Sequence, residues 1–132
     1  MTRALFIVDD SDRTAAHEEV LREFVELAGG VDALILVCGL ATDDAPAVEA
    51  DYIDRFTGFG ARATHLHTDQ PDQLEKATAV WFIDGDETTM HDLVPDNLRT
   101  ELRRRNDEGL LIGGTGTTVT SASGIDVEHD DH

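Results

Sequence analysis

The stretch that decides the fold is Ala33–Cys38, which reads ALILVC and is apolar throughout. A short run of this kind is typical of a parallel strand that is buried on both of its faces. Four further short runs rich in strand-forming residues occur along the chain, at Ala4–Val8, Ala63–His67, Ala79–Ile83 and Leu110–Ile112. Each run is therefore expected to be a strand.

Segments with helical spacing lie between these runs. In Thr14–Ala28 one face of a helix collects the apolar side chains, which are Val20, Leu21, Phe24, Val25, Leu27 and Ala28. Gly29 and Gly30 are expected to end this helix, because glycine readily takes the left-handed conformation of a helix C-terminus.

Three more helical segments are expected further along the chain. One starts near Pro46, a good first-turn residue, and ends near Gly58–Gly60. A short turn covers Asp72–Ala77, and a longer helix covers Asp96–Asn106. The basic end of that last helix, Arg103–Arg105, lies where the helix dipole favours cations.

Strict alternation of strands and helices predicts an α/β fold. We expect a three-layer α/β/α sandwich of the flavodoxin-like type, with a mainly parallel five-stranded sheet. Residues 1–123 are expected to form a single domain, and Gly124–His132 (GIDVEHDDH) an acidic, solvated tail. No internal repeat or low-complexity linker divides the chain.

The charge of the chain is extreme. It has 28 acidic residues against 10 basic ones, a formal net charge of −18, and a single lysine, Lys76. Such charge opposes compaction in dilute buffer and is screened at molar salt, where the Debye length is about 3 Å. This composition predicts a halophilic, cytoplasmic protein. It argues against a nucleic-acid partner, since phosphates would be repelled, and no apolar run is long enough to predict a membrane span.

The most informative turn follows the last predicted strand. In a parallel sheet ligands bind beyond the carboxyl ends of the strands. There Gly113–Thr118 reads GGTGTT, the strand-turn-helix pattern of a nucleophile elbow. The same residues, as a glycine-rich turn, also fit a phosphate-binding loop, but the lysine of a P-loop is missing.

The order of five stretches resembles the first half of the cyanophycinase and dipeptidase E-like serine peptidases, which have a class I glutamine amidotransferase-like fold. The matching stretches are Leu21–Gly30 (LREFVELAGG), Ala33–Asp44 (ALILVCGLATDD), Glu49–Ala61 (EADYIDRFTGFGA), Trp81–Met90 (WFIDGDETTM) and Glu108–Thr118 (EGLLIGGTGTT). This resemblance covers the chain up to about Ser123.

Departures from that family predict a chain without its catalytic machinery. The family's elbow reads roughly Gly-Thr-Ser-Ala-Gly, whereas this chain reads Gly114-Thr115-Gly116-Thr117, with glycine at the nucleophile position. The family's oxyanion turn corresponds to Asp84, Gly85, Asp86 and Glu87, whose carboxylates would oppose developing negative charge. The resemblance places the catalytic histidine and acid well beyond the elbow, in a second half that this sequence is not expected to contain. His129 and His132 do follow Gly116, but an acidic tail is expected to position them poorly.

These features predict a catalytically inactive, cyanophycinase-like protein that serves as a self-assembling or binding module. We expect no cofactor, and a homo-oligomer or extended assembly, because the last strand would otherwise leave an exposed edge. The alternative is an active serine-type peptidase or hydrolase that uses Thr115, Thr117 or Ser121, or a site completed by a partner subunit.

Other constellations point to weaker alternatives. His65 and His67 alternate on one predicted strand near Asp69 and are candidate zinc ligands, although ordinary polar strand-end residues look the same. His129 and His132 in the tail raise the same two alternatives. Asp9, Asp10 and Asp12 follow the first strand as in a phosphorelay receiver, but Lys76 is misplaced for that role. Cys38 is expected to pack as a small apolar residue.

Overall fold

The computed structural model describes residues 5–8, 18–39, 45–67, 70–83 and 94–115. Its strands are β1 (Leu5–Val8), β2 (Leu34–Cys38), β3 (Arg62–His65), β4 (Ala79–Phe82) and β5 (Leu111–Thr115). Its helices are α1 (Glu18–Ala28), α2 (Ala45–Gly58) and α4 (Asp96–Asp107), with 3₁₀ turns η2 (Gly30–Asp32) and η3 (Pro71–Glu75). The prediction of an α/β fold is confirmed.

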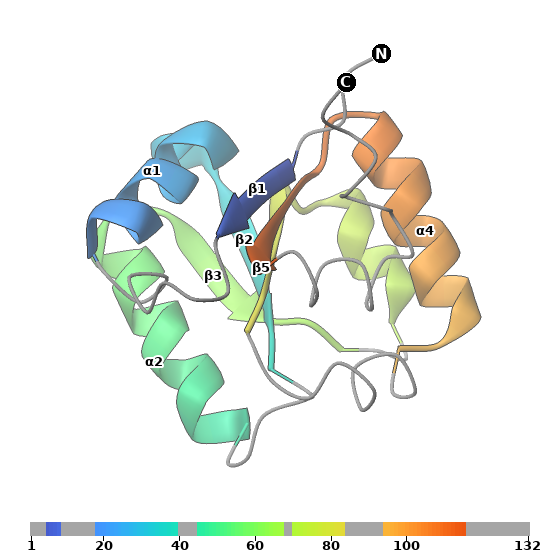
Figure 1. Ribbon diagram of the computed structural model, residues 1–132, viewed down its shortest axis with the longest axis horizontal. Coiled ribbons are helices and arrows are strands. Elements are labelled where there is room, and N and C mark those ends of the chain that lie inside the picture. Colours follow the sequence, from blue (N-terminus) through green and yellow to red (C-terminus); the bar gives the residue numbers. More distant parts are fainter. Residues whose placement is uncertain (1–4, 9–17, 40–44, 68–69, 84–93, 116–132) are drawn as a thin grey trace.

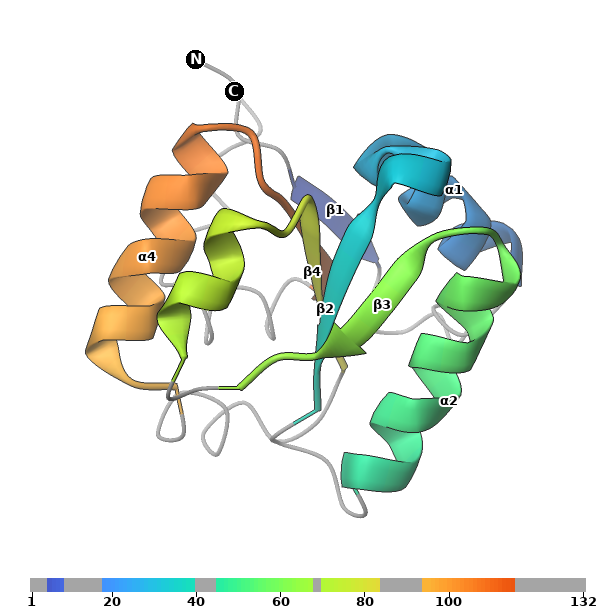
Figure 2. The same ribbon diagram turned by 180° about the vertical axis from the view of Figure 1, so that it is seen from behind.

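The strands form one parallel sheet in the order β1-β5-β4-β2-β3. Figure 1 shows α1 and α2 to one side of this sheet and α4 to the other, and Figure 2 shows the same arrangement from behind. Between α2 and α4 the chain passes from one side of the sheet to the other. η3 already lies on the side of α4, to which it is hydrogen-bonded.

Two apolar clusters fill the spaces between the sheet and its helices. The cluster under α1 and α2 includes Phe24, Ile35, Phe56 and Trp81, and the cluster under η3 and α4 includes Leu36, Leu74, Phe82, Leu98 and Leu102. Neighbouring residues of β2 enter different clusters, as the alternation of a strand requires. The expected core residues Phe24, Phe56, Trp81 and Phe82 are all confirmed as buried.

The first cluster is rich in aromatic rings. Phe24 packs edge-on against Phe6 and Trp81, with ring centroids 5.5 Å and 4.9 Å away. Tyr52 and Phe56 of α2 each lie 6.0 Å from Trp81, measured between ring centroids. Edge-on contacts of this kind add to the stabilisation that comes from burying the rings.

Several predicted boundaries are wrong by a few residues. The third strand ends at His65 and not at His67, and the fifth runs on to Thr115 and does not stop at Ile112. The short turn near residue 72 is the 3₁₀ helix η3. Leu27, expected on the apolar face of α1, is 62% exposed, because the buried stripe is set by Leu21, Phe24, Val25 and Ala28.

The predicted exposed edge at the last strand is also wrong. β5 lies inside the sheet, with β4 on one side and β1 on the other, where Ile112 pairs with Leu5 and Thr115 with Val8. The first strand of the chain therefore covers the edge that was expected to be open. Among the described strands, the sheet edges are β1 and β3.

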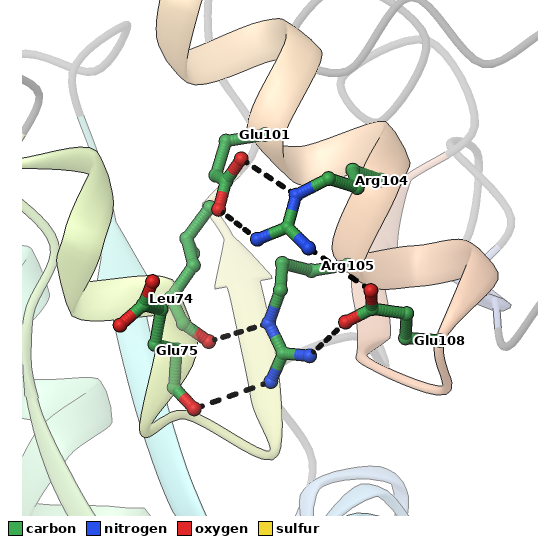
Figure 3. A network of polar contacts seen from close by, with 6 residues as sticks. All are labelled: Leu74, Glu75, Glu101, Arg104, Arg105 and Glu108. Atoms are coloured by element: carbon green, nitrogen blue, oxygen red, sulfur yellow. Dashed lines mark hydrogen bonds and ion pairs between the residues drawn. The ribbon is translucent and has the colours of Figure 1, made fainter.

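A polar network fixes the end of α4 to η3 (Figure 3). Arg105 donates from Nε to the carbonyl oxygen of Leu74 at 3.0 Å and from Nη2 to that of Glu75 at 3.3 Å. Glu108 accepts from both Arg104 and Arg105, at 2.9 Å and 2.6 Å. Since α4 ends just before β5 begins, this network lies at the amino edge of the sheet.

Candidate functional site

The carboxyl edge of the sheet is where a parallel α/β fold presents its ligand-binding residues. Here that edge consists of the last residues of the strands, which are Val8, Cys38, His65, Phe82 and Thr115. Of the predicted site, Gly114 and Thr115 lie in β5, and not in a turn beyond it. Gly116, Thr117 and the segment from Asp84 to Glu87 lie outside the described residues.

Glycine in β5 has a packing role. A Cβ atom on Gly113 would stand 2.4 Å from Cε1 of Phe24 and 2.9 Å from Cε3 of Trp81. The rings of the aromatic cluster therefore occupy the space that a side chain would need. Gly114 has φ 144°, a conformation that favours glycine. Packing against aromatic rings explains Gly113, and backbone conformation explains Gly114.

A polar cluster of three residues lies where β2 and β3 end. Glu49 of α2 accepts a hydrogen bond at Oε2 from the backbone N–H of Gly39, at 2.6 Å. Its Oε1 lies 2.8 Å from Nδ1 of His65. The Glu49 side chain is 12% exposed and that of His65 42% exposed. Because an ionised carboxylate only accepts hydrogen bonds, His65 is the donor to Glu49, from Nδ1.

Gly39 makes room for this carboxylate. A Cβ atom at Gly39 would lie 3.0 Å from Cγ of Glu49 and 3.1 Å from Cδ1 of Ile83, the residue that follows β4. Gly39 and Ile83 thus adjoin at the ends of β2 and β4. These two strands lead to helices on opposite sides of the sheet, so their ends form the topological switch point of the fold.

Gln73 of η3 holds the backbone beyond β3. Its Oε1 accepts from the N–H of His67 at 2.7 Å, and its Nε2 donates to the carbonyl oxygen of His65 at 3.1 Å. A side-chain amide here takes the place of a neighbouring strand. The segment from His65 to His67 is therefore kept extended past the last residue of β3.

The Glu49–His65 pair cannot serve an elbow at the end of β5. Two strands, β2 and β4, separate β3 from β5. Three strand spacings amount to roughly 14 Å, well beyond hydrogen-bond reach. The structure therefore does not bring His65 together with Thr115.

The metal-binding alternative at His65 and His67 stays a prediction. Within the described segments, no group of three or more His, Cys, Asp or Glu residues gathers as a metal site. Asp69, the carboxylate near the two histidines in the sequence, lies outside those segments. Among the described residues, the clearly displaced pKa values belong to α4: the hydrogen bond from Arg104 lowers the pKa of Glu101, and Glu101 raises the pKa of Arg104.

Sequence reasoning gave no role to Glu49 or Gln73, and it placed Gly39 only at the ligand-binding edge of the sheet. A signal for Glu49 existed, because it precedes Ile53 and Phe56 by four and seven residues and so shares the inward stripe of α2. A carboxylate in such a stripe needs a partner. No comparable signal marked Gln73, whose role depends on the packing of η3 beside β3.

Comparison with known proteins gives a distant relationship. A cyanophycinase from Geminocystis herdmanii (strain PCC 6308) is 24% identical over 124 residues, covering 85% of this chain and 46% of that protein. The chain is distantly similar to cyanophycinase. It spans about half the length of this curated relative. No protein-family model matches the chain.

The similarity to cyanophycinase agrees with the resemblance predicted from the ordered stretches of the sequence. It extends over most of the chain, so it includes strands and helices from both sides of the sheet. The described helices include none long and apolar enough to cross a membrane.

Proposed function

We propose that the chain is a non-catalytic, cyanophycinase-like protein that works as a binding or self-assembling module. The observation that carries this proposal is the residue after β5, which is Gly116. In the sequence Gly116 directly follows Thr115, the last residue of β5, and it takes the place of the reactive residue in the elbow pattern. A glycine has no atom that attacks a carbonyl.

The proposed module has the three-layer, five-stranded architecture of the class I glutamine amidotransferase-like fold. Support comes from the two apolar clusters on opposite sides of the sheet and from the distant similarity to cyanophycinase. We place it in the cytoplasm of a halophile because of its net charge of −18. The segment Asp84–Glu87, which follows Ile83 in the sequence, is proposed as part of its binding surface.

The rival proposal is an active hydrolase of the serine-peptidase type. Its support is the position of Thr115 at the carboxyl end of β5, with Thr117 and Ser121 following in the sequence. A hydroxyl of this kind needs a held base within hydrogen-bond reach. The one described histidine that is fixed by a carboxylate lies three strands away, which favours the non-catalytic proposal.

Labelling with a fluorophosphonate probe at molar KCl separates the two proposals. The non-catalytic module is expected to stay unlabelled, while an active serine hydrolase run beside it is labelled. Labelling that disappears in one of the variants Thr115→Val, Thr117→Val or Ser121→Ala would establish the hydrolase. The three variants keep the side-chain volume nearly constant, so loss of label reports on the hydroxyl.

Self-association is part of the proposal, with β1 and β3, the outer strands among those described, as its candidate contact edges. Edge strands offer unpaired backbone groups to a second chain. Light scattering at molar KCl is expected to give a mass of two or more chains. A mass of 14.4 kDa at micromolar concentration would instead describe a monomer.

A further inference from the structure

Several hydrogen bonds from other elements hold the end of β3 in place. His65 is oriented by a carboxylate through Nδ1, and the backbone of His65 and His67 is held at two points by Gln73. Both histidines are at least partly exposed, so both imidazoles are accessible from solvent.

The two histidines lie on one side of the sheet. Leu66, between them, is buried in the cluster under η3 and α4, while Ala63 packs on the cluster under α1 and α2. The backbone N–H of Leu66 also bonds to the carbonyl oxygen of Val37 at 2.9 Å, which continues the ladder beyond β3. Since side chains alternate, His65 and His67 both project on the α2 side.

We propose that His65 and His67 form a binding site for a borderline divalent metal ion of the Zn²⁺, Ni²⁺ or Cu²⁺ class. Residues two apart on a strand stand about 6.6 Å apart. Imidazole nitrogens bind Zn²⁺ at about 2.0–2.1 Å, so the two rings can converge on one ion. Water completes the coordination, because no third described ligand lies close enough.

Glu49 is the positioning residue of this site. Its hydrogen bond at Oε1 directs the Nδ1 proton of His65 away from the ion and leaves Nε2 to coordinate. Carboxylates that hold a ligating histidine in this way also raise the basicity of the ring. The buried N–H of Gly39 fixes Glu49 in turn, so the chain of contacts runs from the backbone of β2 to the metal.

The chain as a whole favours cations at this surface. Its net charge of −18 raises the local concentration of divalent ions. Halide salts screen this long-range attraction, but they leave coordination by imidazole nitrogen in place. The site is therefore expected to select ions that prefer nitrogen ligands over Mg²⁺ and Ca²⁺, which prefer oxygen.

Titration of the full chain with Zn²⁺ by calorimetry, in molar KCl, tests the site. One ion per chain is expected, and His65→Gln and His67→Gln should each weaken binding by at least about tenfold. Glu49→Gln should weaken it by about 10–100-fold. The double variant His129→Gln/His132→Gln, which removes the histidines of the tail, should bind as the parent does.

Three outcomes would overturn the proposal. They are no saturable binding up to about 1 mM Zn²⁺, binding that is lost in the tail variant, and equal affinity in the parent and His65→Gln. A lower melting temperature of Glu49→Gln with unchanged Zn²⁺ affinity would show that Glu49 stabilises the fold and does not position a metal ligand. The site does not depend on the proposed function, since fluorophosphonate labelling and Zn²⁺ binding are read separately.

Discussion

At the scale of single residues, the close packing of neighbouring side chains explains why glycine stands at two positions. Gly39 admits the carboxylate of Glu49, and Gly113 admits the rings of Phe24 and Trp81. The two glycines are needed for different reasons, because one makes room for a polar contact and the other for an aromatic core.

Gly113→Ala is expected to destabilise the protein by about 1–3 kcal/mol, because the new methyl group overlaps Phe24 and Trp81. Urea unfolding at a fixed molar salt concentration measures the change. Gly58→Ala is the matched control, since its Cβ meets nothing within 4 Å and its stability should be unchanged or slightly higher. Equal stability of Gly113→Ala and the parent would refute the packing described for β5.

The ion pair of Glu101 with Arg104 gives a pH dependence. The pKa of Glu101 is lowered in the folded chain, chiefly by its hydrogen bond from Arg104. Its contribution to stability is therefore present above the unfolded pKa of about 4.3 and is lost as the pH falls through the folded pKa. The parent should exceed Glu101→Gln in urea midpoint at pH 7, and the difference should vanish in acid. A difference that grows as the pH falls would contradict this assignment.

At the scale of elements, the sequence predicts where the strands lie better than it predicts which strands pair. The apolar runs of β2 and β4 identified them because they are buried on both faces. The position of β1 beside β5 had no sequence signal, since pairing between the first and last strands depends on the path of the whole chain. That path is why the expected open edge at β5 was wrong.

The candidate site was predictable only in part, for the same reason. His65 and His67 could be singled out by their alternation on one strand. Their fixation depends on Glu49 from α2 and Gln73 from η3, which are distant in the sequence. Gly116 could be read from the sequence, because the elbow pattern is local.

The helix α4 is expected to contribute mainly through its apolar stripe. Leu98 is fully buried in the cluster under η3 and α4, so Leu98→Ala should cost about 2–5 kcal/mol. Leu27→Ala, at a position 62% exposed, should stay within about 0.5 kcal/mol of the parent. Thermal and urea unfolding of both variants check this, and similar losses in the two would contradict the buried stripes assigned to α1 and α4.

At the scale of the whole molecule, the net charge of −18 dominates behaviour in solution. Self-repulsion opposes folding when it is poorly screened. The urea midpoint is therefore expected to rise between about 0.1 M and about 1 M KCl, over which the Debye length falls from about 10 Å to about 3 Å. A midpoint that is highest in dilute buffer would remove the case for a halophilic protein.

The proposal that no nucleophile follows β5 is tested by measuring the intact mass of the protein. The full chain is incubated with excess fluorophosphonate in molar KCl and its mass is then measured. The unchanged mass of the chain is the predicted result. A population heavier by one phosphonyl group, absent after heat denaturation before exposure to the probe, would contradict the claim.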